Sequence, residues 1–289
     1  MEIKELVPLS NKTTMRIGGF ARYFAELSSR EDVEVAAAFS RDHHLPLIIL
    51  GNGSNTVFAE GTIEALVARI QANGVQIHNG SVTVEAGKNL AMLINELAEK
   101  GLDLSSLTGI PGTVGGALFG NAGQGPTGVW VDRFVRSVTV FDHGTWRILP
   151  HHECSFAYRE SVFKHMRGAS PVIMEVELMV PARAPEDIRM NIALLLQKRI
   201  ETQPHLKTAG SCFKAVGKTP AWKLIDAAGL RGVRIGDVEI STKHANFLLN
   251  TGKGTYGDAK NIVKKVRSAI PESLEVEMRF IETDGSLAF

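Results

Sequence analysis

A glycine-rich stretch, residues 109–123, constrains this chain more than any other part of its sequence. It reads GIPGTVGGALFGNAG, with glycine at positions 109, 112, 115, 116, 120 and 123. Glycine carries no Cβ and tolerates positive φ, so the backbone N–H groups of such a stretch can approach a ligand closely. Clustered N–H groups beside a helix start favour an anion, most often a phosphate. The stretch therefore predicts a phosphate-bearing ligand held by the main chain.

A second glycine turn, GNGSN at residues 51–55, follows the apolar run 45–50. Taken singly, each glycine stretch is more typical of a tight turn than of a binding site. Two such stretches, each placed after an apolar segment, suggest the two walls around a diphosphate.

Composition excludes several classes of function. The formal net charge is +1, so no nucleic-acid or anionic-membrane partner is expected. Two cysteines without a CxxC pair argue against a disulfide framework or zinc site and suit a reducing compartment. Adjacent histidines at 43–44 and 151–152 point apart, so no metal site is expected. The charged N-terminus predicts no secretory signal, and no apolar run is long enough to span a bilayer.

The order of predicted elements is strand-rich first and mixed later. Residues 29–32 resemble a capping box that opens a helix, and 255–258 resemble another. The clearest boundary is PARAP at residues 181–185, where a strongly helical segment begins. Further predicted elements include strands at 45–50, 65–70, 75–77, 82–86, 135–141, 146–149, 172–180 and 247–250, helices at 90–98, 185–201 and 221–228, and a closing strand at 274–281.

Several motifs, taken in order along the chain, are more specific than any one of them. They are KTTMRIGG at 12–19, LGNGSN at 50–55, the stretch 109–123, YRES at 158–161, GSCFK at 210–214, KHANF at 243–247 and LEVE at 274–277. Together they resemble the UDP-N-acetylenolpyruvoylglucosamine reductase (MurB) family, in its shorter subtype. The chain departs from the family in having Ala215-Val216 for the usual Asn-Pro, and Gln124-Gly125-Pro126 for the usual Ala-Tyr-Gly.

The resemblance implies an α+β fold with two domains. A two-part FAD-binding domain of the vanillyl-alcohol-oxidase (PCMH) type would cover residues 1–182, and residues 272–289 would return to it. A smaller α+β substrate-binding domain would cover residues 185–271. The implied cofactors are non-covalent FAD and NADPH.

The implied activity is that of UDP-N-acetylmuramate dehydrogenase. Such an enzyme reduces the enolpyruvyl ether of UDP-N-acetylglucosamine to UDP-N-acetylmuramate in the cytoplasm, for peptidoglycan synthesis and hence for cell shape and division. The only partner implied is this small-molecule substrate. Two other functions stay open: a flavin oxidase of the same fold, and a nucleotide-sugar or flavin binding module without turnover.

The resemblance also implies three catalytic residues. Hydride addition at the β-carbon leaves negative charge at the α-carbon, delocalised into a carboxylate, and a guanidinium such as that of Arg159 binds carboxylates well. Ser211 matches the family's proton donor, and its neighbour Cys212 is expected to point away as a small buried residue. Glu277 matches the family's C-terminal acid, and Glu275 has the same strand parity.

Binding residues follow from the same resemblance. Those expected to bind substrate are Arg199 and Lys214, as cations for its diphosphate, and Asn246. Those expected to bind FAD are Leu50, Gly51, Asn52, Gly53, Ser54, Asn55, Gly109, Ile110, Pro111, Gly112, Thr113, Gly115, Gly116, Asn121, Ala122 and Gly123.

Overall fold

The computed structural model describes residues 1–78, 80–124, 128–166 and 171–289. Gly125 and Pro126, where the sequence departs from the family pattern, lie outside the described residues. No helix in the described ranges is long and apolar enough to cross a membrane.

The first sheet has the strand order β1-β2-β5-β3. Its strands are β1 (Ile3–Pro8), β2 (Phe20–Leu27), β5 (Thr62–Ile70) and β3 (Leu47–Leu50). Strand β5 is parallel to both neighbours, whereas β1 runs antiparallel to β2. Helix α1 (Arg30–Asp42) packs on this sheet and begins as expected, because the Ser29 side chain accepts a hydrogen bond from the Asp32 N–H.

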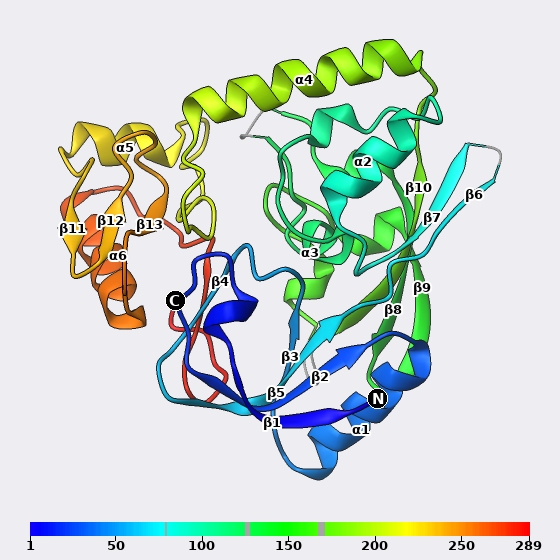
Figure 1. Ribbon diagram of the computed structural model, residues 1–289, viewed down its shortest axis with the longest axis horizontal. Coiled ribbons are helices and arrows are strands. Elements are labelled where there is room, and N and C mark those ends of the chain that lie inside the picture. The colour runs from blue at the N-terminus through cyan, green and yellow to red at the C-terminus, as the bar shows by residue number, and fades with distance from the viewer. Residues whose placement is uncertain (79, 125–127, 167–170) are drawn as a thin grey trace.

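The second sheet is antiparallel, with the strand order β6-β7-β10-β8-β9. Its strands are β6 (Val75–His78), β7 (Ser81–Glu85), β10 (Val172–Met179), β8 (Val135–Asp142) and β9 (Thr145–Pro150). Helices α2 (Leu90–Ala98) and α3 (Val114–Phe119) lie beside it (Figure 1). Helix α2 ends as expected before Gly101, which has φ +68°.

A smaller lobe lies in the second half of the chain (yellow to orange in Figure 1). It contains helices α5 (Ala221–Ala227) and α6 (Tyr256–Ala269) and the strands β11 (Arg234–Ile235), β12 (Val238–Ile240) and β13 (Leu248–Asn250). The predicted capping box of α6 is present in both directions, between the Thr255 and Asp258 side chains and the opposite backbone N–H groups.

The end of the chain leaves this lobe. Strand β14 (Arg279–Ile281) pairs in parallel with β4 (Thr56–Phe58), directly after the 51–55 turn. The expected strand over 274–281 is therefore shorter than predicted, because residues before Arg279 form only an isolated bridge, between Phe213 and Val276. This path brings the segment 275–279 beside the glycine turn. The limits expected for the two domains stay a prediction.

Two apolar cores hold these layers together. The first fills the space between the second sheet and helices α2 and α3, and it includes Ile188 and Ile192 of α4 (Pro185–Thr202). Helix α4 thus packs on the first part of the chain, and it also reaches the small lobe (Figure 1). The second core joins β2, β4 and β5 to the small lobe through residues such as Phe58, Phe213 and Val263.

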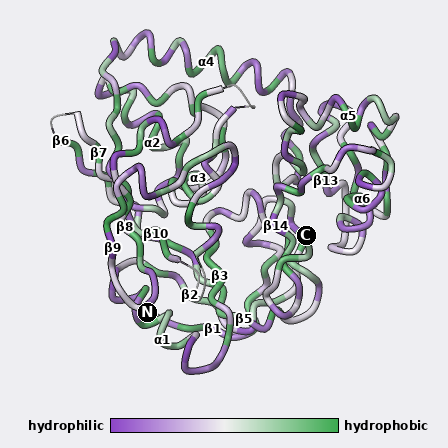
Figure 2. Tube along the Cα trace, turned by 180° about the vertical axis from the view of Figure 1, so that it is seen from behind, coloured by the Kyte–Doolittle hydropathy of each residue, from purple (hydrophilic) through white to green (hydrophobic). Residues whose placement is uncertain are grey.

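Burial explains why these parts stay together. Strand β3, of sequence LIIL, is among the hydrophobic segments of the chain (Figure 2). Full burial of one large apolar side chain contributes about 1.5–3 kcal/mol.

Short 3₁₀ turns complete the described fold at Ser10–Lys12, Ser105–Leu107, Val131–Phe134, His151–Cys154 and Val162–Lys164.

Candidate active site

A cavity of about 1190 Å³ is lined by residues from the first sheet, the second sheet, α4 and the small lobe. Fifteen of the sixteen expected cofactor residues line it, as do all six expected catalytic and substrate residues. The exception is Asn121, which is fully buried behind the wall. Its side chain donates to Ala157 O and accepts from the Asp132 N–H, so it supports neighbouring loops.

The two glycine stretches pack directly against each other. A Cβ on Gly51 would lie 2.6 Å from the Thr113 Oγ1, and one on Gly112, which has φ +112°, would lie 2.8 Å from the Ser54 Oγ. The Ser54 hydroxyl donates to Pro111 O across the same contact at 3.3 Å. Glycine is required here because any side chain would force the stretches apart.

The first turn lines the cavity and has four unused backbone donors within the described part of the chain. Residues 52–55 line the wall, and among the described residues their backbone N–H groups have no hydrogen-bond partner. Two carbonyl oxygens of the turn are occupied, because Arg69 donates to Gly51 O and Thr14 donates to Gly53 O. The free N–H groups therefore form a main-chain cradle that suits an anion such as a diphosphate.

Some N–H groups of the second stretch donate within the protein. Gly115 N–H donates to Ala86 O at 2.8 Å, and Gly116 N–H donates to the Thr113 Oγ1 at 3.2 Å. Four others have no hydrogen-bond partner within the described residues: those of Gly109, Gly112, Thr113 and Gly123. Both stretches therefore line the cavity with unused main-chain donors.

Arg159 sits in a strained turn at the cavity wall. Its φ is +57°, in the left-handed region that non-glycine residues seldom adopt. The turn is closed by two backbone hydrogen bonds of 3.1 Å between Ala157 and Glu160. The guanidinium Nη2 donates to Gly123 O at 3.0 Å, and the Nε lies 3.0 Å from the Glu277 Oε1. The buried Nε is thus occupied by Glu277, and among the described residues the Nη1 has no partner, which leaves the Nη1 as a donor for a ligand.

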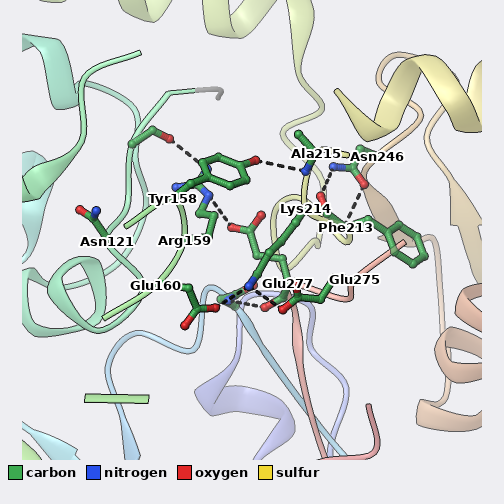
Figure 3. Close-up of polar contacts among 12 residues, drawn as sticks. Asn121, Tyr158, Arg159, Glu160, Phe213, Lys214, Ala215, Asn246, Glu275 and Glu277 are labelled. Carbon is green, nitrogen blue, oxygen red and sulfur yellow. Dashed lines mark hydrogen bonds and ion pairs between the residues drawn. The ribbon is translucent and has the colours of Figure 1, made fainter. Parts of the chain in front are cut away.

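Glu277 is the carboxylate that faces Arg159 (Figure 3). Burial raises the pKa of Glu277 above its usual value, although Arg159, Lys164 and Lys214 act in the opposite direction. Glu275, its competitor by strand parity, is paired with Lys214 and is mostly exposed. The structure thus brings Glu277, and not Glu275, to the arginine.

Ser211 lines the cavity on the segment that pairs with Phe247. Cys212 next to it is fully buried, and burial raises the pKa of its thiol. The segment is fixed by Asn246, whose amide donates to Phe213 O at 2.9 Å and accepts from the Phe213 N–H at 3.0 Å. Asn246 is only 6% exposed, so its side-chain amide mainly serves to fix the backbone of Phe213.

Arg199 reaches the cavity from the last turn of α4. A Cβ on Gly109 would lie 2.2 Å from the Arg199 Cδ, so the guanidinium lies over the glycine. Its nitrogens donate to the Gln203 side chain and to Thr108 O. Burial, and then the nearby Arg159, lower the pKa of Arg199. Within the described residues it has no carboxylate partner, so it is available to an anionic ligand.

One functional candidate was not found from the sequence. Arg279 lines the cavity, and its guanidinium carbon lies 5.2 Å from the centre of the Phe119 ring. Burial lowers the pKa of Arg279, and within the described residues it has no carboxylate partner. Its position two residues after Glu277 was the available signal, because alternate residues of an extended segment share a face.

Comparisons with known proteins match both parts of the chain. A family model described as "FAD binding domain" matches residues 21–147, and one described as "UDP-N-acetylenolpyruvoylglucosamine reductase, C-terminal domain" matches residues 203–281. The chain is similar to the UDP-N-acetylenolpyruvoylglucosamine reductase of Moorella thermoacetica, with 38% identity over 94% of this chain and 89% of that protein. It is similar to that of Aquifex aeolicus, with 35% identity over 97% and 95%.

A solved structure supports the same relation. The UDP-N-acetylenolpyruvylglucosamine reductase of Thermus caldophilus superposes with a TM-score of 0.82 at 32% identity, covering 96% of this chain and 98% of that one. The expected α+β fold, with an FAD-binding domain and a smaller second domain, is confirmed.

Proposed function

Because the chain belongs to the UDP-N-acetylenolpyruvoylglucosamine reductase (MurB) family, we propose that it reduces the enolpyruvyl ether of UDP-N-acetylglucosamine to UDP-N-acetylmuramate, with NADPH as the reductant. It is an FAD-dependent oxidoreductase of peptidoglycan precursor synthesis. Its two cysteines are free and buried, which suits a reducing compartment, so we place it in the cytoplasm.

The observation that carries the proposal is the content of one cavity. Within the described residues it holds a turn with four unpaired N–H groups, a serine on the opposite lobe, and three arginines, Arg159, Arg199 and Arg279. Residues 52–55 fit the diphosphate of FAD, because they line the cavity and their four N–H groups have no partner among the described residues. When bound, FAD supplies the hydride that adds to the β-carbon of the substrate.

Arg159 and Arg199 are assigned to the two negatively charged groups of the substrate, its carboxylate and its diphosphate. We assign the Arg159 Nη1, which has no partner among the described residues, to the substrate carboxylate, where it stabilises the charge that develops as the α-carbon becomes basic. Arg199, in the last turn of α4, lines the cavity and is assigned to the substrate diphosphate. Glu277 orients Arg159 from the other side.

Ser211 is placed to protonate the α-carbon. A hydroxyl is a weak acid, so it serves only against a strongly basic carbon. Cys212 is a poor alternative, because its thiol is fully buried and burial raises its pKa further. The proposed roles thus divide the chemistry between a carboxylate-binding arginine and a proton-donating serine on different lobes.

Anaerobic addition of NADPH and then substrate tests the proposal. We expect the yellow protein to bleach with NADPH and to regain its colour with the enolpyruvyl substrate in the absence of oxygen. Recovery of colour only with oxygen would point to an oxidase, and absence of bleaching would point to a binding module. Release of FAD on denaturation checks that the cofactor is bound non-covalently.

A further inference from the structure

A cluster of charged side chains lies behind the proposed carboxylate site. The Lys214 Nζ lies 2.5 Å from the Glu160 Oε1 and 2.5 Å from the Glu275 Oε1, and the Lys214 side chain is only 9% exposed (Figure 3). The Glu160 Oε2 also meets the His165 Nε2 at 2.9 Å. We call Lys214, Glu160 and Glu275 the lysine clip.

The clip joins three segments that are far apart in sequence. Glu160 directly follows Arg159, Glu275 lies two residues before Glu277, and Lys214 lies three residues after Ser211. The backbone also contributes, since the Lys214 N–H donates to Glu275 O at 2.9 Å. Each member of the clip is thus placed beside one of the proposed catalytic residues.

The turn that carries Arg159 needs such support. A non-glycine residue at φ +57° is strained, and it persists only where the surroundings fix it. Lys164 supports the turn from within, because its Nζ donates to Arg159 O at 2.5 Å and lies 3.6 Å from the Glu160 Oε1. Glu160 is the point at which the turn is attached to the rest of the site.

The charges of the clip are already matched within the protein. Burial alone would raise the pKa of Glu160, but the hydrogen bonds from Lys214 and His165 outweigh it and hold the pKa low. Burial would lower the pKa of Lys214, but its hydrogen bonds to Glu160 and Glu275 raise it. The Lys214 ammonium is therefore satisfied by two carboxylates before any phosphate is bound.

Building on the proposed function, we infer that Lys214 and Glu160 are positioning residues. The clip holds the Arg159 turn in its strained conformation, so that the guanidinium meets the carboxylate of the ligand. This role differs from the diphosphate contact that the sequence predicts for Lys214. The two roles can be separated, because they concern different groups on the ligand.

Two nucleotide sugars provide the test. UDP-N-acetylmuramate carries the carboxylate that Arg159 recognises, whereas UDP-N-acetylglucosamine carries the same diphosphate and lacks the carboxylate. Binding of each to the FAD-loaded protein is followed by the change in flavin absorbance. For Lys214→Met we expect the affinity for UDP-N-acetylmuramate to fall about 10- to 100-fold, the value of one charged hydrogen-bonded contact. The affinity for UDP-N-acetylglucosamine should stay within about twofold.

Further variants check that the effect arises from the clip. Glu160→Gln should give the same selective loss of affinity. The double variant should bind UDP-N-acetylmuramate as well as Lys214→Met does, because both changes break the same Lys214–Glu160 contact. Lys214→Arg should recover most of the affinity, since arginine can still reach two carboxylates. Lys218→Met, an exposed lysine on the following loop, is the matched control and should bind both ligands normally.

Three results would overturn the inference. An equal loss for both ligands assigns Lys214 to the diphosphate, and no loss for either in Lys214→Met and Glu160→Gln leaves the clip without a positioning role. If the wild-type protein binds the two ligands equally well, the role proposed for Arg159 fails, and the inference falls with it. That last result is seen before any variant is made, so it is distinguishable from failure of the clip alone.

Discussion

Asn246 is the position at which structure and sequence make different predictions. The sequence resemblance assigns it to the substrate, whereas its amide is engaged by both backbone groups of Phe213 at 2.9 and 3.0 Å. Asn246→Ala leaves a buried N–H and a buried C=O without partners, and each such group costs about 1–3 kcal/mol. Water entering the vacated space recovers part of this, so we expect a loss of about 2–3 kcal/mol in the free energy of unfolding.

Urea denaturation at a fixed, saturating FAD concentration measures this loss. Asn261→Ala, an exposed asparagine on α6, is the control and should change the free energy of unfolding by less than about 0.5 kcal/mol. The reasoning is refuted if Asn246→Ala unfolds like the wild type while the KM for the enolpyruvyl substrate rises steeply. In that case the amide would be a substrate ligand, as the sequence predicts.

Three further predictions concern the cofactor and the buried acid. Gly51→Val should weaken FAD binding about tenfold or more, because its Cβ would lie 2.6 Å from the Thr113 Oγ1, whereas Gly257→Ala in α6 should bind FAD normally in equilibrium dialysis. Arg279→Met should lower the affinity for FAD about tenfold, because a buried cation on the cavity wall is lost, whereas the exposed Arg41→Met should not; equal affinities would place the FAD away from Arg279. Because burial raises the pKa of Glu277 above its usual value of 4.5, the folded protein holds more protons than the unfolded chain just above that pH. The free energy of unfolding of the FAD-free wild type should therefore fall relative to that of Glu277→Gln as the pH rises from 4.5, and parallel pH profiles would contradict this.

The local parts of the fold could be predicted from the sequence. Capping residues act on the nearest turn of a helix, so Ser29 and Thr255 are sufficient to locate the starts of α1 and α6. The glycine stretches were likewise recognised from their composition, and they do pack together. The sequence alone does not show why each of these positions requires glycine. For example, a Cβ added to Gly115 would lie 2.8 Å from the Ala86 Cβ. The packing of helix α3 therefore requires glycine there, with or without a ligand.

Long-range pairing could not be predicted, because nothing near a residue in sequence indicates its distant partner. Asn121 follows the glycine-rich helix, yet its partners are Ala157 and Asp132, and it lies behind the cavity wall. Lys214 was recognised as a cation, but its two carboxylate partners come from segments 54 and 61 positions away. Residue propensities also do not predict the left-handed turn at Arg159, since arginine disfavours that conformation.

The role of Ser211 is tested most directly by measuring the two half-reactions of Ser211→Ala separately by anaerobic stopped flow. Reduction of the bound flavin by NADPH should proceed at the wild-type rate, because that step requires no proton at the α-carbon of the substrate. Reoxidation by the enolpyruvyl substrate should slow about 10²- to 10⁴-fold, the usual contribution of a general acid. Equal slowing of both half-reactions would make Ser211 structural, and no slowing of either would show that another group donates the proton.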